Sequence, residues 1–244
     1  MFKKNHKGLS VFLSLFGLIF LVTPFISSCG KSSNSNASVL KIQYQVVNLN
    51  QGIGSVDLYV HYIKVNSSSY FYPSSSGYFY LPSIDTPFQI RPGTSLTPGT
   101  IPPSYNILTL KNALVPNTKY TLMLMGLNRD TVYSIFTADT SSIPSAGKGK
   151  VRFVNASPNN LGQVSVTAND STAFAGVAFR TMTKFIELTA GTYDFKMYQT
   201  GSSNVIFDKP NVTIQDGRIY TLYCYGLASR TDSLAFGSGF ITNK

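Results

Sequence analysis

The sequence has few of the residues from which most active sites are built. It contains no tryptophan, two cysteines and two histidines, and only 12% of its residues are charged. His6 lies in the amino-terminal segment, which leaves His61, and Glu187 is the single glutamate. A catalytic triad needs a base beside its nucleophile, and a zinc site needs about four clustered ligands. This inventory predicts that the protein is not an enzyme and holds no metal or cofactor.

The first residues have the pattern of a bacterial export signal. Residues 1–8 carry three lysines and no acid, and residues 9–22 form an apolar run that is shorter than the roughly 20 residues a membrane-spanning helix needs. The stretch Ile26-Ser27-Ser28-Cys29-Gly30 resembles the lipobox of bacterial lipoproteins. We therefore predict a signal peptide over residues 1–28, diacylglycerol on Cys29, and a flexible Ser- and Asn-rich tether over residues 29–38.

This prediction also constrains the location and the partners. A lipidated Cys29 places the protein in the cell envelope of a Gram-negative-type bacterium, attached to the outer membrane on its periplasmic or its surface face. Removing the three lysines of the signal lowers the formal charge from +10 to about +7, and the remaining basic residues are scattered. A nucleic-acid partner is therefore not expected. The expected partners are the membrane, and a glycan or an envelope protein.

An internal repeat predicts two domains. Tyr120-Thr121-Leu122 recurs as Tyr220-Thr221-Leu222, and each copy is followed three residues later by Gly-Leu. Upstream, residues 44–48 align with residues 151–155. A period near 100 residues indicates whole domains, because solenoid repeats are shorter. We place domain 1 at residues 39–140, a linker at 141–148 and domain 2 at 149–244.

Each copy has the pattern of β-strands. Apolar residues alternate with polar ones from Val56 to Tyr62 and again from Tyr193 to Tyr198, the period-two signature of half-buried strands. The runs 120–125 and 220–225 are apolar on both faces, as in the central strands of a sandwich. The predicted fold is all-β, with two tandem antiparallel β-sandwich domains of the immunoglobulin-like or transthyretin-like type.

A family resemblance rests on motifs of the second copy. It carries Val-Arg-Phe-Val-Asn-Ala-Ser-Pro at residues 151–158, Leu-Thr-Ala-Gly-Thr-Tyr at 188–193 and Tyr-Thr-Leu at 220–222. These motifs resemble the domain of unknown function 4397 over about residues 148–240. The resemblance implies a compact β-sandwich, often in tandem, with no established activity. Asn155 and Pro158 suit a turn that leaves a strand, and Gly191 suits a positive φ.

The remaining reactive groups have plain structural interpretations. His61 is predicted to be a solvated strand residue. Cys224 occupies the position of Leu124 in the repeat, which favours a buried core thiol over a reactive one. A glycan-active enzyme that uses a carboxylate pair stays open as an alternative, because nine aspartates are available, for instance Asp194 or Asp208.

One aromatic segment is a candidate binding surface. Residues 70–80 are near-palindromic, and a hairpin centred on Ser75 would pair Tyr70 with Tyr80, Phe71 with Phe79 and Tyr72 with Tyr78. Strand alternation would bury the phenylalanines and present a platform on the opposite face. The platform would contain Tyr70, Tyr72, Tyr78 and Tyr80, whose rings suit sugars or a protein partner. Alternatively, these tyrosines are ordinary cross-strand pairs or lie buried under the next loop.

The predicted function is a non-catalytic binding or scaffolding module. A proline-rich loop over residues 82–103 is expected to cover a sheet edge, or else to shape a recognition surface beside the tyrosines. A fimbrial or adhesive subunit is a further alternative. It would assemble by strand addition and would need a displaceable terminal strand such as residues 234–242.

Overall fold

The computed structural model describes residues 42–81, 85–93, 105–158 and 162–244. Met1–Val39 and Leu40–Lys244 form separate units, and only the second is described below. The predicted signal peptide, Cys29, the tether and most of the proline-rich loop lie outside the described residues. Within the described part of the chain, no helix is long and apolar enough to cross a bilayer.

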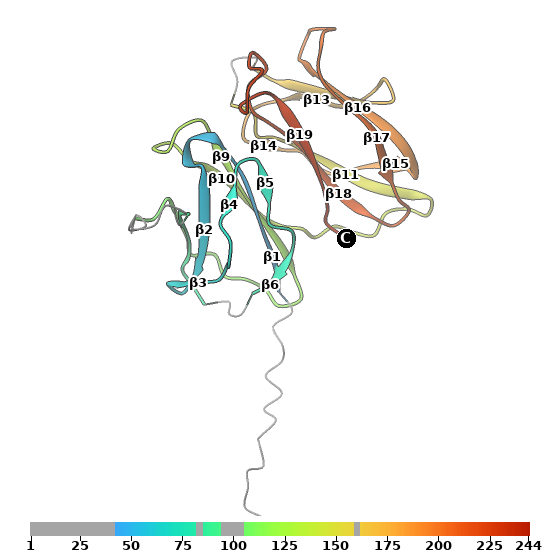
Figure 1. The fold of residues 1–244 in the computed structure, drawn as a ribbon. Coiled ribbons are helices and arrows are strands. Elements are labelled where there is room, and N and C mark those ends of the chain that lie inside the picture. The colour runs from blue at the N-terminus through green and yellow to red at the C-terminus, as the bar shows by residue number, and fades with distance from the viewer. Residues whose placement is uncertain (1–41, 82–84, 94–104, 159–161) are drawn as a thin grey trace, which may run out of the picture. The chain divides into compact units, whose positions relative to one another are not determined.

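The first half of the described chain forms a sandwich of two sheets (Figure 1). One sheet contains β1 (Gln43–Asn50), β5 (Ser74–Ser75), β6 (Phe79–Tyr80), β9 (Lys119–Gly126) and β10 (Tyr133–Ala138). The other sheet contains β2 (Ser55–Val60), β3 (Ile63–Lys64), β4 (Tyr70–Phe71), β7 (Phe88–Pro92) and β8 (Leu108–Leu110). A short 3-10 helix, η1 (Gln51–Ile53), joins β1 to β2 and so connects the two sheets.

The second half repeats this arrangement. One sheet contains β11 (Lys148–Asn155), β14 (Thr181–Met182), β15 (Ile186–Thr189), β18 (Ile219–Tyr225) and β19 (Gly237–Thr242). The other sheet contains β12 (Val164–Ala168), β13 (Ser171–Val177), β16 (Gly191–Gln199) and β17 (Val205–Ile214). The all-β sandwich prediction is therefore confirmed. The division at residues 39–140 and 149–244 stays a prediction, because both halves belong to one compact unit.

Each half contains one parallel strand pair, so the predicted antiparallel sandwiches each include one mixed sheet. β1 runs parallel to β9 over eight residue pairs, and β11 runs parallel to β18 over six. Parallel neighbours need a long crossover connection. Here the crossover passes through the opposite sheet of the same sandwich, which a local turn pattern does not reveal.

The internal repeat is reproduced residue by residue in these parallel pairs. Tyr44 is paired with Tyr120 in the first half, and Val151 with Tyr220 in the second. In the same registers, Asn48 is paired with Leu124 and Asn155 with Cys224. Both asparagines accept a hydrogen bond from the backbone N–H two residues on, at 3.2 Å from Asn50 and at 3.1 Å from Ser157. The predicted turn role of Asn155 is thus confirmed.

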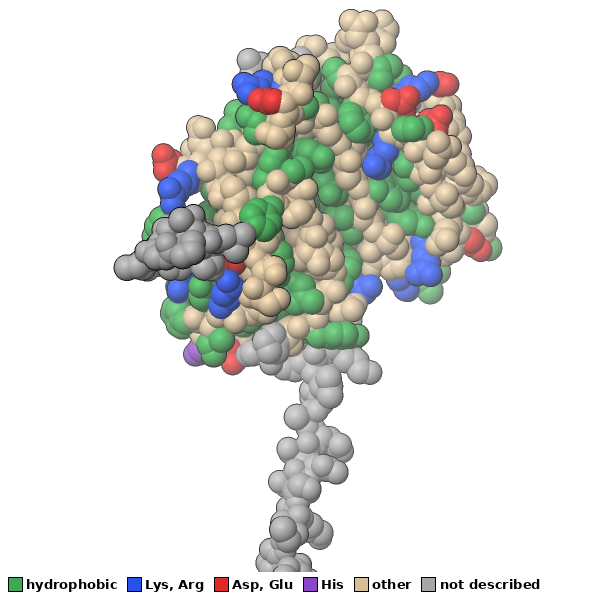
Figure 2. All heavy atoms as spheres, viewed as in Figure 1, with side chains coloured by type: hydrophobic (Ala, Val, Ile, Leu, Met, Phe, Trp, Pro, Cys, Tyr) green, Lys and Arg blue, Asp and Glu red, His purple; other side chains and the backbone are tan. Residues whose placement is uncertain are grey.

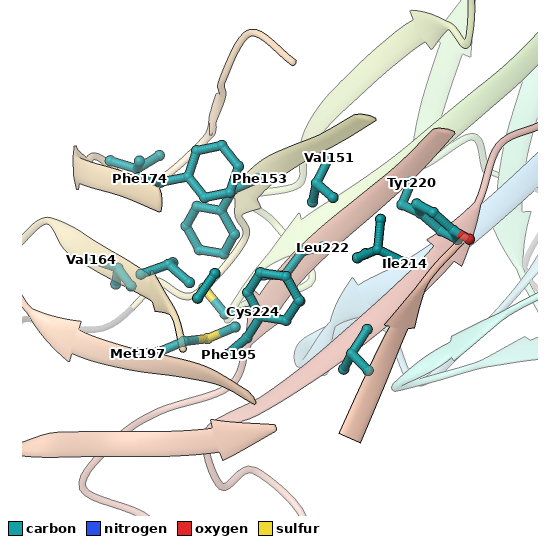
Figure 3. Packing of buried hydrophobic residues seen from close by; sticks show 14 of the residues in the cluster. Val151, Phe153, Val164, Phe174, Phe195, Met197, Ile214, Tyr220, Leu222 and Cys224 are labelled. Carbon is teal, nitrogen blue, oxygen red and sulfur yellow. The ribbon is translucent and has the colours of Figure 1, made fainter. Parts of the chain in front are cut away.

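Each sandwich has its own hydrophobic core. In the second half, Phe153, Leu222 and Cys224 from one sheet face Val164, Phe195 and Met197 from the other (Figure 3). The first half has an equivalent core, in which the Tyr44 ring stacks on Phe88 with centroids 5.8 Å apart. Large-to-small changes at such fully buried positions typically cost about 2–5 kcal/mol.

A third hydrophobic cluster joins the two halves. Its buried members are Val47, Leu49, Met123, Met125, Val154, Ala156, Tyr223 and Ile241. They come from β1 and β9 in the first half and mostly from β11, β18 and β19 in the second. This cluster explains why the runs 120–125 and 220–225 are apolar on both faces. One face of each run packs into the core of its own sandwich, and the opposite face packs against the other half of the chain.

Three local predictions are corrected. β2 ends at Val60, and the expected strand residues His61 and Tyr62 instead have φ of 46° and 66° and form the turn to β3. Gly191 begins β16 without a positive φ, so the positive φ predicted for it is wrong. Asp57, on the expected polar face of β2, is also buried, and its carboxylate is compensated by Lys64 Nζ at 2.8 Å and by hydrogen bonds from Asn66 and Ser69.

Candidate functional site

A hollow of about 570 Å³ opens on the side of the first sandwich. It lies between β4, which extends one sheet, and β5 and β6, which extend the other. We call it the aromatic hollow, and it is lined by Val65, Asn66, Ser67, Ser68, Ser69, Tyr70, Phe71, Ser74, Ser75, Ser76, Phe79 and Tyr80. None of these residues is charged. Figure 2 shows green hydrophobic side chains scattered over much of the visible face of the described chain.

The predicted hairpin of residues 70–80 does not form. Tyr70 pairs with Val56 of β2, whereas Phe79 and Tyr80 pair with Tyr44 and Gln43 of β1. The segment is therefore shared between two sheets instead of pairing with itself. Strands β1 and β2 would otherwise have edges with unpaired backbone N–H and C=O groups. Pairing residues 70–80 with these edges satisfies those groups, which a hairpin within the segment would not do.

The geometry that was predicted for the tyrosine platform is therefore wrong. Tyr80 is 64% exposed, but Tyr70 packs on the core and stacks on Phe79 with ring centroids 6.4 Å apart. Phe71, which the alternation placed inside, is 54% exposed. The two exposed rings of the hollow are therefore Phe71 and Tyr80. Whether any of the four tyrosines binds a ligand stays a prediction.

The other two tyrosines face the second half of the chain. The Tyr72 ring meets Tyr225 edge to face with centroids 5.9 Å apart, and its hydroxyl accepts a hydrogen bond from Gln51 Nε2 at 3.0 Å. The Tyr78 hydroxyl donates to Asp139 Oδ2 at 2.8 Å and accepts from Asn243 Nδ2 at 2.8 Å. Burial, followed by the nearby Asp139 charge, raises the pKa of Tyr78 well above its usual value. Both residues thus contribute to the contact between the halves.

The six serines of the hollow differ in their exposure and partners, and Ser74 Oγ donates to the Phe71 carbonyl while Ser75 Oγ accepts from Gln45 Nε2. Ser69 Oγ donates to Asp57 Oδ1 at 2.7 Å, and Ser76 Oγ accepts from the Val46 N–H at 2.9 Å, so both hydroxyls are engaged within the protein. Ser67 and Ser68 are exposed at the rim. A ligand in the hollow would therefore meet two exposed aromatic rings and exposed hydroxyl groups, but no charged side chain from the lining.

A second hollow of about 510 Å³ lies between β13 and β15 of the other sandwich. It contains Glu187, whose carboxylate accepts a hydrogen bond from the Ser145 N–H at 3.1 Å and lies 3.7 Å from Lys148 Nζ. These interactions, led by the Ser145 hydrogen bond, lower the pKa of Glu187. A general acid of a glycosidase typically has a raised pKa, and the shift at Glu187 is in the opposite direction. Asp194, named as a candidate carboxylate, accepts from the Asn211 N–H at 2.8 Å, and Asp208 lies on β17 opposite Lys196.

The other reactive groups take structural positions. Cys224 is fully buried and free, and burial raises its pKa to about 12, so the predicted core thiol is confirmed. His61 is exposed, as predicted, but in a turn. Among the described residues, no three His, Cys, Asp or Glu side chains cluster as metal ligands. Ile241 of the terminal strand β19 is buried between the halves, and its neighbour β18 pairs with β19 at six positions.

A buried ion pair between the halves was not foreseen from the sequence. Arg152 Nη2 donates to Asp139 Oδ1, and the two side chains are 3% and 0% exposed. Thr121 Oγ1 also donates to Asp139 at 2.7 Å, and Arg152 Nε donates to Thr221 Oγ1 at 2.9 Å. Burial raises the pKa of Asp139, while Thr121 and Arg152 act in the opposite direction. The only sequence signal was that both copies of the repeat carry threonine after the tyrosine, at positions 121 and 221.

Comparison with known proteins gives one family. Residues 43–162 and 159–237 each match the family described as Domain of unknown function (DUF4397). The first match extends through β11 of the second half. Together the matches cover most of the 244 residues. No curated protein matches the sequence.

Proposed function

The chain belongs to the DUF4397 family, whose function is unknown, and from this premise we propose that it is a lipid-anchored, non-catalytic binding module of the cell envelope. We further propose that the aromatic hollow binds an uncharged glycan. The single observation that carries this proposal is the lining, in which exposed Phe71 and Tyr80 flank polar side chains and no charge is present.

The chemistry of the lining suits a sugar better than it suits a reaction. Aromatic rings stack on the apolar faces of sugar rings, while hydroxyl groups such as those of Ser67 and Ser68 exchange hydrogen bonds with sugar hydroxyls. General acid–base catalysis would need a titratable side chain within hydrogen-bonding reach of the ligand. The aromatic hollow contains only tyrosine hydroxyls in that class, and burial raises the pKa of Tyr70 to about 12.

A glycan array probed with the purified mature protein tests this function, and we expect neutral oligosaccharides to bind. Replacing both Phe71 and Tyr80 with Ala should weaken binding roughly 5- to 150-fold, because aromatic contacts contribute roughly 0.5–1.5 kcal/mol each. Tyr105→Ala is the matched control, since Tyr105 is 43% exposed but lies outside the hollow. Equal binding by the double variant and the wild type would exclude the hollow, and absence of any glycan ligand would favour a protein partner.

The anchor is a separate proposal that rests on the lipobox-like residues 26–30. We expect cleavage before Cys29, acylation of its thiol, and attachment to the outer membrane of a Gram-negative-type cell. Mass spectrometry of the amino-terminal peptide from native cells checks this expectation. A free Cys29 thiol, or an uncut signal peptide, would contradict it. Protease treatment of intact cells would then distinguish the periplasmic face from the surface face.

A further inference from the structure

The loops at one end of the first sandwich surround the point where the described chain begins. The carbonyl of Ile42 accepts a hydrogen bond from the Leu81 N–H at 3.2 Å, and the Gln43 N–H donates to the Thr118 carbonyl at 3.2 Å. Tyr80 of β6 is paired with Gln43 of β1. The start of β1, the end of β6 and the start of β9 therefore lie together in one sheet.

The opposite sheet contributes its loops at the same end. The stacking of Tyr44 on Phe88 places the start of β1 over the start of β7. Phe88 is paired with both Val60 and Leu110, so β2 and β8 also end here. The His61 N–H donates to the Pro87 carbonyl at 3.0 Å, which holds the β2–β3 turn in place. We call this end the tip.

The tip carries a concentration of exposed apolar side chains. Tyr62, Ile63 and Val115 are 61%, 69% and 60% exposed, and Tyr80 borders both the tip and the aromatic hollow. These four residues are among only nine large hydrophobic side chains that are exposed in the described chain. Single exposed apolar residues need no explanation, but a group at one end indicates a contact surface.

The repeat provides an internal reference for this surface. The β12–β13 turn of the second half, Asn169-Asp170, corresponds to the β2–β3 turn, His61-Tyr62. All four residues have a positive φ. It is 46° and 66° at His61 and Tyr62, and 47° and 63° at Asn169 and Asp170. Asparagine and aspartate are favoured in such two-residue turns, whereas a bulky aromatic residue there is unusual. The first half thus has a less favourable turn that presents an aromatic ring to the outside.

The charges at the tip are few and mostly basic. Lys111, which follows β8, is exposed, and Lys119 Nζ lies 4.9 Å from the centroid of the Tyr78 ring. Lys64 is paired with Asp57, and Asp85 is exposed nearby. Tyrosine, aliphatic side chains and lysine together are typical of surfaces that rest in the headgroup region of a bilayer.

We propose that the tip rests on the lipid bilayer surface and orients the two sandwiches on the membrane. This inference depends on the proposed lipid at Cys29. Residues 29–41 span at most about 45 Å when fully extended, so the bilayer lies within reach of the end at which the described chain begins. The contact would insert Tyr62 and Ile63 shallowly and would leave the aromatic hollow accessible from the side.

Single tryptophan reporters test the proposal, because the chain has none of its own. The full lipidated protein is reconstituted into phosphatidylcholine vesicles whose acyl chains carry bromine, which quenches tryptophan on contact. Tyr62→Trp at the tip is compared with Tyr105→Trp, an exposed tyrosine near the opposite end of the same sandwich. We expect a shift of Trp emission to shorter wavelength and at least twofold stronger quenching for the tip variant only.

Three outcomes would overturn the proposal. Equal quenching of both reporters would mean a tethered body with no preferred contact, and an emission shift without bromine quenching would mean that protein covers the tip. A chain that does not float with vesicles would contradict the anchor, and the tip contact with it. A protein that floats with the vesicles but shows equal quenching of both reporters would contradict the tip contact and leave the anchor intact. The variant His61→Asn with Tyr62→Asp, paired with Ile63→Trp as reporter, should lose the quenching yet still bind glycan through Phe71 and Tyr80.

Discussion

At the scale of single residues, Cys224 shows how a reactive group becomes inert. Its thiol lies in the core beside Met197 and Phe195 (Figure 3), and Sγ contacts Asn155 Oδ1 at 3.3 Å. The thiolate is the nucleophile of cysteine chemistry. Because burial raises the pKa of Cys224 to about 12, the thiolate is absent at neutral pH. The group therefore acts as a small hydrophobic side chain, as its equivalence with Leu124 indicated.

We predict that Cys224 does not react with Ellman's reagent in the folded protein and reacts once guanidinium unfolds it. In the unfolded chain the thiol ionises near pH 9, but in the folded protein it stays neutral up to about pH 12. The stability linked to the thiol is therefore complete below pH 9 and is lost as the pH rises towards 12. Cys224→Ala should remove the contribution of the thiol to the pH dependence of the free energy of unfolding. Buried tyrosines such as Tyr223 should keep their own contributions to it. Rapid labelling of the native thiol would refute the prediction.

At the scale of elements, the β2–β3 turn combines an unfavourable backbone with exposed aromatic side chains. Residues other than glycine cost roughly 1–2 kcal/mol in the left-handed region, with asparagine and aspartate the best tolerated. We predict that His61→Asn with Tyr62→Asp keeps the hairpin and raises the free energy of unfolding by about 0.5–1 kcal/mol. Chemical denaturation measures this change. A loss of stability would mean that the native side chains are held by contacts within the protein.

Residues 70–80 show where an element could not be inferred from its own sequence. The near-palindrome favoured a hairpin, and local pairing is the simplest reading of such symmetry. The structure instead adds Tyr70 to β2 and Phe79 to β1, because strands far away in sequence offer longer unpaired edges. The long strands were easier to predict. Residues 120–125 and 220–225 needed only their own composition to be recognised as central.

At the scale of the whole molecule, the Asp139–Arg152 pair joins the two halves. Asp139 follows β10 of the first sandwich and Arg152 lies on β11 of the second. A buried ion pair contributes little compared with a hydrophobic pair of the same shape, but removal of one partner leaves an uncompensated buried charge. The pair therefore favours one arrangement of the halves over others, because any shift would separate the charges.

We predict that Arg152→Met lowers the free energy of unfolding by about 3–5 kcal/mol. Adding Asp139→Asn should recover part of that loss, since the unpaired charge is then absent. Lys196→Met is the matched control. It removes an ion pair whose Asp170 partner is 76% exposed, and an exposed pair is worth about 1 kcal/mol or less. Similar losses for both single variants would show that the buried pair has no special role.

The sequence by itself determined the strand character, the twofold repeat and the buried state of Cys224. These properties follow from the alternation of side chains and from comparison of the two copies, and neither requires knowledge of which segments touch. It also supports the prediction of an anchor at Cys29, which the described residues do not test. The tertiary structure alone decided the parallel pairing of β1 with β9, the division of residues 70–80 between two sheets, and the buried pair between the halves. It also decided which loops share an end. Each depends on contacts between residues distant along the chain, and no local pattern records which partner wins.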